Sequence, residues 1–142
     1  MRLSCASSYA LQALNCLARH GGPLSARMIA WEHLLPVRFL LKVLRPLVAA
    51  GVLKSVRGPG GGYRLSRSPS NISVLEIVEA IDGPIRGVAP GLIYHWEWMK
   101  THNPARSAQA TKALDRKLER LCQAVAENVR ASLDRVKLSD LS

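Results

Sequence analysis

A glycine-rich run, Arg57-Gly58-Pro59-Gly60-Gly61-Gly62, interrupts the first half of this chain and limits what it can fold into. No regular helix or strand continues through such a run, because glycine is conformationally free and proline lacks a backbone N–H. The flanking segments, 52–56 and 63–66, have the composition of short strands. The run therefore predicts the turn of a β-hairpin whose backbone can approach another surface closely. The alternative is a hairpin tip that is merely flexible.

Two helices are expected at the start of the chain. Apolar residues at helical spacing predict a first helix over residues 4–20, ended by Gly21. Ser25 is a suitable N-cap for a short second helix over residues 26–33. His33 is expected to cap or pack at the end of that helix.

A third helix is expected from Pro36, as a first-turn proline, to Ala50. Pro46 should bend this helix or end it early, because it removes a backbone hydrogen bond. Three helices with a tight turn before the third, followed by a hairpin, predict a winged helix-turn-helix. The fold class is therefore mainly α with a small β-hairpin (α+β).

Positive charge gathers in the first half of the chain. Residues 1–72 contain 10 Lys and Arg against one acid, whereas residues 73–142 contain 10 against 9 acids. In the third predicted helix Arg38, Lys42 and Arg45 recur at the i, i+4, i+7 spacing that places them on one face. This pattern favours double-stranded DNA as the partner of the first half. The alternative is a basic surface that only faces water.

The hairpin and its surroundings carry a resemblance to a known family. The run from Val56 to Leu65 resembles the wing signature of the Rrf2 family of bacterial winged-helix regulators, which includes IscR-like and NsrR-like proteins. Residues 1–4 and 9–11 resemble the family's opening, and residues 39–51 resemble its recognition helix. Residues 72–84 resemble the helix that follows. The resemblance covers residues 1–84 closely and the remainder in outline.

The resemblance implies a homodimeric DNA-binding regulator, usually a repressor. It places Arg57 in the minor groove, Arg38, Phe39 and Lys42 in the major groove, and Ser25 on a phosphate. Leu41 stands where the iron–sulfur cluster regulator carries an acid, so the preferred operator is expected to differ. The complete set of expected DNA-binding residues is Ser25, Arg38, Phe39, Lys42, Arg45, Ser55, Arg57, Gly58, Gly60, Gly61, Tyr63 and Arg64.

The cysteines do not follow the family's cluster-binding pattern. Cluster-binding relatives carry three cysteines after the equivalent of residues 82–84, but residues 85–101 contain none here. No Cys-x-x-Cys pair and no Cys/His cluster at zinc spacing occurs, and the odd count of three cysteines is typical of a reducing compartment. We therefore expect no iron–sulfur cluster, no other cofactor, no metal site and a cytoplasmic location. A thiol switch at Cys122 is an alternative role.

Residues 94–99, Tyr-His-Trp-Glu-Trp-Met, leave two interpretations open. The first is that Trp96 and Trp98 seal this loop onto the core. The second is a small-molecule or metal site for an effector, with His95, Trp96 and Trp98 as its candidate residues.

A long helix is predicted from Pro104 to Val136. Its apolar stripe is too long for the small first module to cover, so we expect it to pair with a second copy of the chain. Residues 136–141 are expected to fold back as a short tail. The domains are thus a DNA-binding domain (1–84), a sensor-type loop (85–103), and a dimerisation helix with its tail (104–142). The expected interface residues are Leu114, Leu118, Leu121, Val125, Val129 and Leu133.

Two functions from different classes remain. The first is a dimeric transcriptional regulator reading a pseudo-palindrome, with a small-molecule, metal or thiol sensor as a variant. The second is a module that keeps the fold but binds another protein. No paired carboxylates, activated nucleophile or phosphate loop appears, so an enzyme is not expected. No apolar stretch approaches a membrane span, so no membrane partner is expected either.

Overall fold

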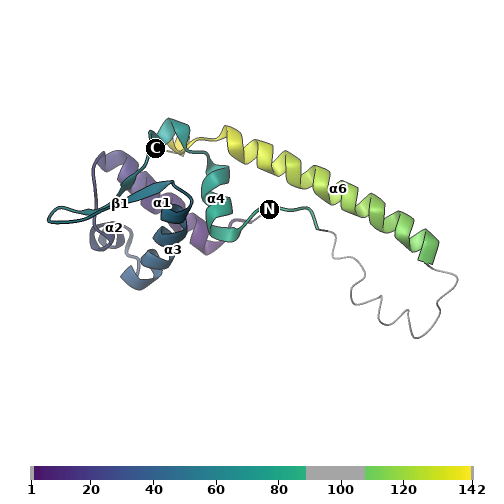
Figure 1. Ribbon diagram of the computed structural model, residues 1–142, viewed down its shortest axis with the longest axis horizontal. Helices are drawn as coiled ribbons and strands as arrows, with labels where there is room; N and C mark the ends of the chain where they lie inside the picture. Colours follow the sequence, from purple (N-terminus) through teal and green to yellow (C-terminus); the bar gives the residue numbers. More distant parts are fainter. Residues whose placement is uncertain (1, 89–107, 142) are drawn as a thin grey trace. The chain divides into compact units, whose positions relative to one another are not determined.

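A computed structural model describes residues 2–88 and 108–141. The predicted fold class is confirmed, because the described chain is mainly helical and its strands form a two-stranded antiparallel hairpin (Figure 1). The elements in chain order are α1 (Cys5–His20), α2 (Ala26–His33), α3 (Val37–Ala49), β1 (Leu53–Val56), β2 (Gly62–Leu65), η1 (Pro69–Asn71), α4 (Val74–Asp82), α6 (Ala108–Arg135) and η2 (Leu138–Leu141).

The chain forms two compact units, one of residues 1–84 with 132–142 and one of residues 85–131. The boundary predicted after residue 84 coincides with the end of the first part of this unit, whereas residues 132–142 were expected to belong with the long helix. The structure places that tail in the first unit because Leu138 is fully buried in its core. The Leu138 amide also donates a hydrogen bond of 2.9 Å to the carbonyl of Ile72.

The first two helices begin at serine caps. Ser4 caps α1 by accepting a hydrogen bond from the amide of Ser7, and Ser25 caps α2 by accepting one from the amide of Met28. α2 has the predicted bounds. It ends at Leu34, whose φ of 53° is left-handed and turns the chain toward α3. These caps supply acceptors for N–H groups that lack a partner within the helix.

The third helix differs from expectation at both prolines. Pro36 occupies the N-cap position with extended backbone rather than the first helical turn. The helix continues through Pro46 to Ala49, so it does not end early. The buried side chains of Leu44 and Leu47 on either side of Pro46 hold this last turn in the core. Their burial outweighs the hydrogen bond that proline removes.

The core of the first unit lies among α1, α3 and α4, with contributions from α2, β1 and the returning tail. Helices supply most of its fully buried large side chains, so the small hairpin contributes little to the core. These side chains are Leu14, Leu17, Ile29, Leu40, Leu44, Leu47, Leu53, Ile72, Ile77 and Leu138.

The hairpin of β1 and β2, residues 53–65, is called the wing below. Its register pairs Leu53 with Leu65 and Val56 with Gly62. A further bridge joins β2 to the segment before α2, because Tyr63 and Leu24 exchange backbone hydrogen bonds of 2.8 and 2.9 Å. The base of the wing is thereby fixed beside the N-terminus of α2, while its glycine-rich end projects from the helices (Figure 1).

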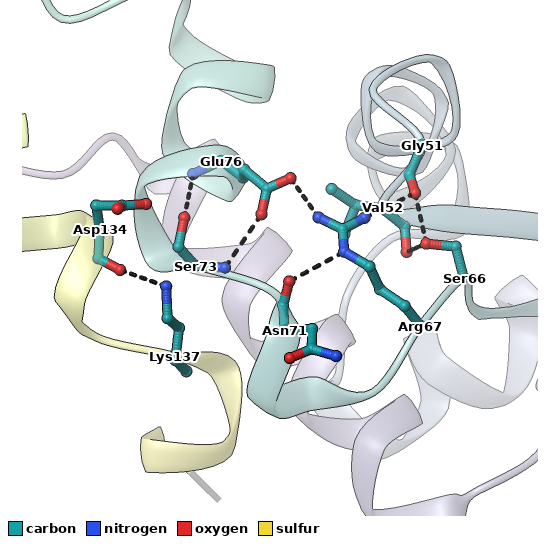
Figure 2. Close-up of polar contacts among 9 residues, drawn as sticks. All are labelled: Gly51, Val52, Ser66, Arg67, Asn71, Ser73, Glu76, Asp134 and Lys137. Carbon is teal, nitrogen blue, oxygen red and sulfur yellow. Dashed lines mark hydrogen bonds and ion pairs between the residues drawn. The ribbon is translucent and has the colours of Figure 1, made fainter.

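A polar network joins the end of the wing to α4 (Figure 2). Arg67 forms an ion pair with Glu76 and donates to the carbonyl oxygens of Gly51 and Asn71. Glu76 also accepts from the amide of Ser73, whose hydroxyl accepts from the amide of Glu76, so the two residues form a capping box. This network fixes the start of α4 relative to α3 and the wing.

In the second unit, residues 85–88 pack closely on α6. A Cβ added to Gly87 would lie 2.1 Å from the backbone carbonyl of Cys122, so only glycine fits there. Across the described parts of the chain, no helix is long and apolar enough to span a membrane.

Candidate nucleic-acid interface

The exposed face of α3 is cationic. Arg38, Lys42 and Arg45 are all exposed, whereas Leu40, Val43, Leu44 and Leu47 are buried on the other side. The 3.6-residue period therefore separates the helix into an apolar face toward the core and a basic face toward solvent. A helix of this kind fits the major groove, where Arg and Lys can reach guanine edges and phosphates.

Phe39, which the resemblance places in the major groove, is only partly exposed. Its ring is half-buried against the core and meets the ring of Tyr9 edge to face, with centroids 5.3 Å apart. Such a pair stabilises the docking of α3 on α1. Phe39 thus packs against Tyr9 with part of its surface still exposed, and its expected contact with DNA stays a prediction.

Ser25 stands at the N-terminus of α2, as predicted. Its Oγ accepts from the amide of Met28 at 3.2 Å. The hydroxyl proton is not used in that bond, so it can still be donated to a phosphate oxygen. The partial positive charge of the helix N-terminus favours an anion at the same place.

The wing presents charge on a glycine framework. Lys54, Ser55, Arg57 and Arg64 are exposed, and Gly58 and Gly60 have φ values of 95° and 75° that other residues rarely adopt. Gly61 folds tightly within the turn, since a Cβ there would lie 2.3 Å from the carbonyl oxygen of Val56. Tyr63 is half-buried, and its backbone bridge to Leu24 attaches the wing to the segment before α2.

Most cations of this surface lack an acidic partner. Within residues 2–88 and 108–141, ion pairs engage Arg19 with Glu32 and Arg67 with Glu76. No described acid pairs with the other cations of residues 1–72. Their charge is available to a polyanion, because nothing within the described chain neutralises it. They are Arg2, Arg27, Arg38, Lys42, Arg45, Lys54, Arg57 and Arg64.

The two other predicted sites are placed only in part. His95, Trp96 and Trp98 lie outside the described residues. On α6, Leu114, Leu118, Leu121 and Val125 are exposed, and Val129 and Leu133 are half-buried. α6 thus carries an apolar stripe that the described residues leave largely exposed.

The structure also brings together three residues that the sequence analysis did not connect. Cys16 of α1 is 2% exposed, and its Sγ donates a hydrogen bond of 2.9 Å to Oε2 of Glu32. His33, the next residue, offers a ring nitrogen to the same cluster. The signal in the sequence was weak, because Cys16 and the pair Glu32-His33 lie on different helices at no motif spacing.

Burial and the contact with Glu32 alter the chemistry of this cluster. Burial, reinforced by donation to Glu32, raises the pKa of the Cys16 thiol to about 12. The thiol hydrogen bond in turn lowers the pKa of the Glu32 carboxyl, helped by the nearby Arg19. Cys16 is therefore a protonated thiol at neutral pH and Glu32 a carboxylate.

The family model described as Rrf2, iron-dependent transcriptional regulator, matches residues 3–142. The chain belongs to the Rrf2 family. This confirms the resemblance found in the sequence, and it places the chain among transcriptional regulators rather than enzymes.

Individual members of the family are similar to this chain in sequence and in structure. The regulator CymR of Bacillus subtilis is 38% identical over 90 residues, covering 62% of this chain and 65% of CymR. IscR of Aliivibrio salmonicida is 36% identical over 84 residues, covering 58% of this chain and 50% of IscR. The chain thus spans between half and two thirds of these curated relatives. The solved structure of CymR, the global cysteine regulator of B. subtilis, superposes with a TM-score of 0.71 at 27% identity, covering 99% of this chain and 95% of CymR.

Proposed function

We propose that this chain binds double-stranded DNA as a homodimer in the cytoplasm and represses transcription from a pseudo-palindromic operator. In this proposal α3 enters the major groove and Arg57 of the wing enters the neighbouring minor groove. The observation that carries it is the set of exposed, acid-free cations on α3 and the wing. Cations so placed meet phosphates and base edges in the wide groove and the strongly negative potential of the narrow one.

The homodimer is supported by the exposed stripe on α6. Leu114, Leu118, Leu121 and Val125 recur at coiled-coil spacing, and leaving them in water is unfavourable. Pairing this stripe with that of a second copy would bury it. Two copies related by a two-fold axis would then read two half-sites separated by whole turns of DNA.

The regulator in this proposal acts without an iron–sulfur cluster. Thiolates hold such clusters, and residues 85–101, where cluster-binding relatives carry their cysteines, contain none. An effector at residues 94–98 is part of the same proposal, since aromatic and imidazole groups are typical of small-molecule sites. Anaerobically purified protein that carries stoichiometric iron and sulfide would contradict the cluster-free proposal.

The first experiment is sequencing of sheared genomic DNA that the purified protein retains at near-physiological salt. We expect a recurring pseudo-palindrome. The affinity for that sequence is then compared between the unaltered chain and Arg57→Ala, which should lose about 1–3 kcal/mol and some preference for a narrow minor groove. Arg120→Ala, on α6, removes the same charge outside the proposed interface and should bind normally.

Two outcomes would overturn the proposal. Equal loss in Arg57→Ala and Arg120→Ala would mean that total charge, not the wing, supports binding. If the retained DNA fragments share no sequence, the proposed sequence-specific recognition by α3 would be wrong.

Protein binding is the second candidate function, and exposed apolar side chains of α2 favour it. Trp31 is 85% exposed and lines one shallow hollow with Met28, and Leu34 in the following turn is 90% exposed. If neither the unaltered chain nor Arg57→Ala retains any DNA, protein binding would be favoured over DNA recognition.

A further inference from the structure

We propose that Cys16, Glu32 and His33 form a binding site for a Zn²⁺-like divalent cation between α1 and α2. This inference goes beyond DNA binding and does not depend on it. The three residues each present a ligand atom, and these atoms all lie within 4.8 Å of one another. Sulfur, imidazole nitrogen and carboxylate oxygen are the ligand types that Zn²⁺ uses in proteins.

The geometry requires only a small adjustment. Tetrahedral Zn²⁺ with ligands at about 2.0–2.3 Å separates its ligand atoms by roughly 3.5 Å. No pair of ligand atoms must therefore close by more than about 1.3 Å, whereas Sγ of Cys16 and Oε2 of Glu32, now 2.9 Å apart, must separate slightly. His33 is the last residue of α2 and precedes the left-handed Leu34, so its position at a helix end allows such a shift.

An unsatisfied nitrogen supplies an independent indication. Nε2 of His33 is buried and makes no hydrogen bond to any residue that the structure describes. A buried polar atom without a partner is costly, and a bound ion is one of the features that explain it. A cation bound at Nε2 would give this buried atom the partner that it lacks.

The carboxylate is already oriented for this role. Oε1 of Glu32 accepts from Nη2 of Arg19 at 2.6 Å, and Oε2 accepts from the Cys16 thiol. When the cation binds, the S–H bond of Cys16 breaks, a sulfur–metal bond forms and the proton goes to solvent. Oε2 then turns from the thiol to the cation while Arg19 continues to hold Oε1, as outer-shell partners do in metal sites.

The ligand set leaves a fourth position for water. Three protein ligands and an open position are typical of zinc sites that are not purely structural. The site also lies at the end of α2, and only three residues separate His33 from the start of α3 at Val37. A cation bound at this site would therefore alter the turn that leads into α3.

Titration of the full chain with Co²⁺ tests the proposal, because a thiolate–Co²⁺ bond gives a charge-transfer absorption that Zn²⁺ abolishes on competition. We expect one Co²⁺ per chain with this absorption. Cys16→Ser should abolish the absorption and His33→Gln should weaken binding at least about tenfold. Cys5→Ser, which removes an exposed cysteine of the same helix, should leave both unchanged.

Circular dichroism of each variant shows whether it is folded, and His33→Gln keeps the test decisive if Cys16→Ser unfolds. Absence of Co²⁺ binding to the unaltered folded chain would overturn the proposal. Charge-transfer absorption that survives Cys16→Ser, or that disappears in Cys5→Ser or Cys122→Ser, would overturn it as well.

Discussion

Ser7, which is fully buried, donates a hydrogen bond of 2.7 Å to Oδ2 of Asp82, and Ser4 donates one of equal length to Oδ1. Both oxygens of the carboxylate at the end of α4 are thus held by the first turn of α1. The partial positive charge of that helix N-terminus adds to the attraction. One side chain therefore joins two helices that are distant in sequence.

Asp82→Ala should lower the free energy of unfolding by about 2 kcal/mol, because it leaves the buried hydroxyl of Ser7 without its acceptor. Urea unfolding followed by circular dichroism measures the change. Asp115→Ala, which removes an acid from α6, should change stability by less than about 0.5 kcal/mol. Equal effects of the two substitutions would show that the contact with Ser7 contributes nothing.

Gly62→Ala should destabilise the chain more than Gly60→Ala. Both glycines have positive φ, but a Cβ on Gly62 would lie 2.2 Å from the carbonyl oxygen of Leu24, whereas Gly60 has open space. Gly60→Ala should cost about 1–2 kcal/mol from backbone strain alone. Gly62→Ala adds a backbone clash that separates the wing from α2. Thermal unfolding of both variants provides the comparison, and a larger loss in Gly60→Ala would contradict it.

The thiols should react with alkylating reagents at different rates. Cys5 is exposed, Cys122 is half-buried and Cys16 is buried with its pKa raised to about 12. Because the thiolate is the nucleophile, Cys16 should resist iodoacetamide in the folded chain at mildly alkaline pH. Mass spectrometry of digested, timed samples measures each rate. Labelling of Cys16 as fast as Cys5 would mean that α1 and α2 open readily.

Leu138→Ala should cost about 2–5 kcal/mol, as expected for a fully buried leucine in a core. Leu141→Ala, in the same short η2 turn but exposed, is the matched control and should be nearly neutral. Urea denaturation midpoints of the two variants distinguish them. A neutral Leu138→Ala would show that the tail is not needed for the first unit.

Leu121→Glu should convert the proposed dimer to a monomer, because it places a charge in the exposed apolar stripe of α6. Gln123→Glu introduces the same charge on another face of the helix and should leave the mass unchanged. Sedimentation equilibrium of the two variants gives the molar masses. A dimeric Leu121→Glu, or a monomeric unaltered chain, would refute this interface.

Local sequence signals, such as N-caps and turn residues, predicted the positions of the first helices and of the wing well. Ser25, as an N-cap, placed the start of α2, and the glycine run placed the wing, because caps and turns depend on a few neighbouring residues. Of the two effects expected from Pro46, a bend or an early end, the early end does not occur, since the burial of Leu44 and Leu47 is a tertiary effect. The family resemblance rested on this same local pattern.

Features that depend on distant residues could not be predicted from the sequence. The contact of Asp82 with Ser7 and the cluster of Cys16 with Glu32 and His33 join separate helices without a recognisable spacing. The edge-to-face contact between Phe39 and Tyr9 likewise joins two helices and had no signal in the sequence. The expected roles of the exposed cations remain predictions for binding experiments.

The return of Leu138 to the core beside Ile72 has a consequence for how the protein folds during synthesis. Residues 85–131 separate the two parts of the first unit, so the ribosome must make all of them before that core is complete. Until then the apolar surface that Leu138 covers stays open to solvent and to chaperones. α3 and the wing therefore reach full stability only after the proposed dimer helix has been made. A nascent chain thus does not complete the first unit before the ribosome has made α6.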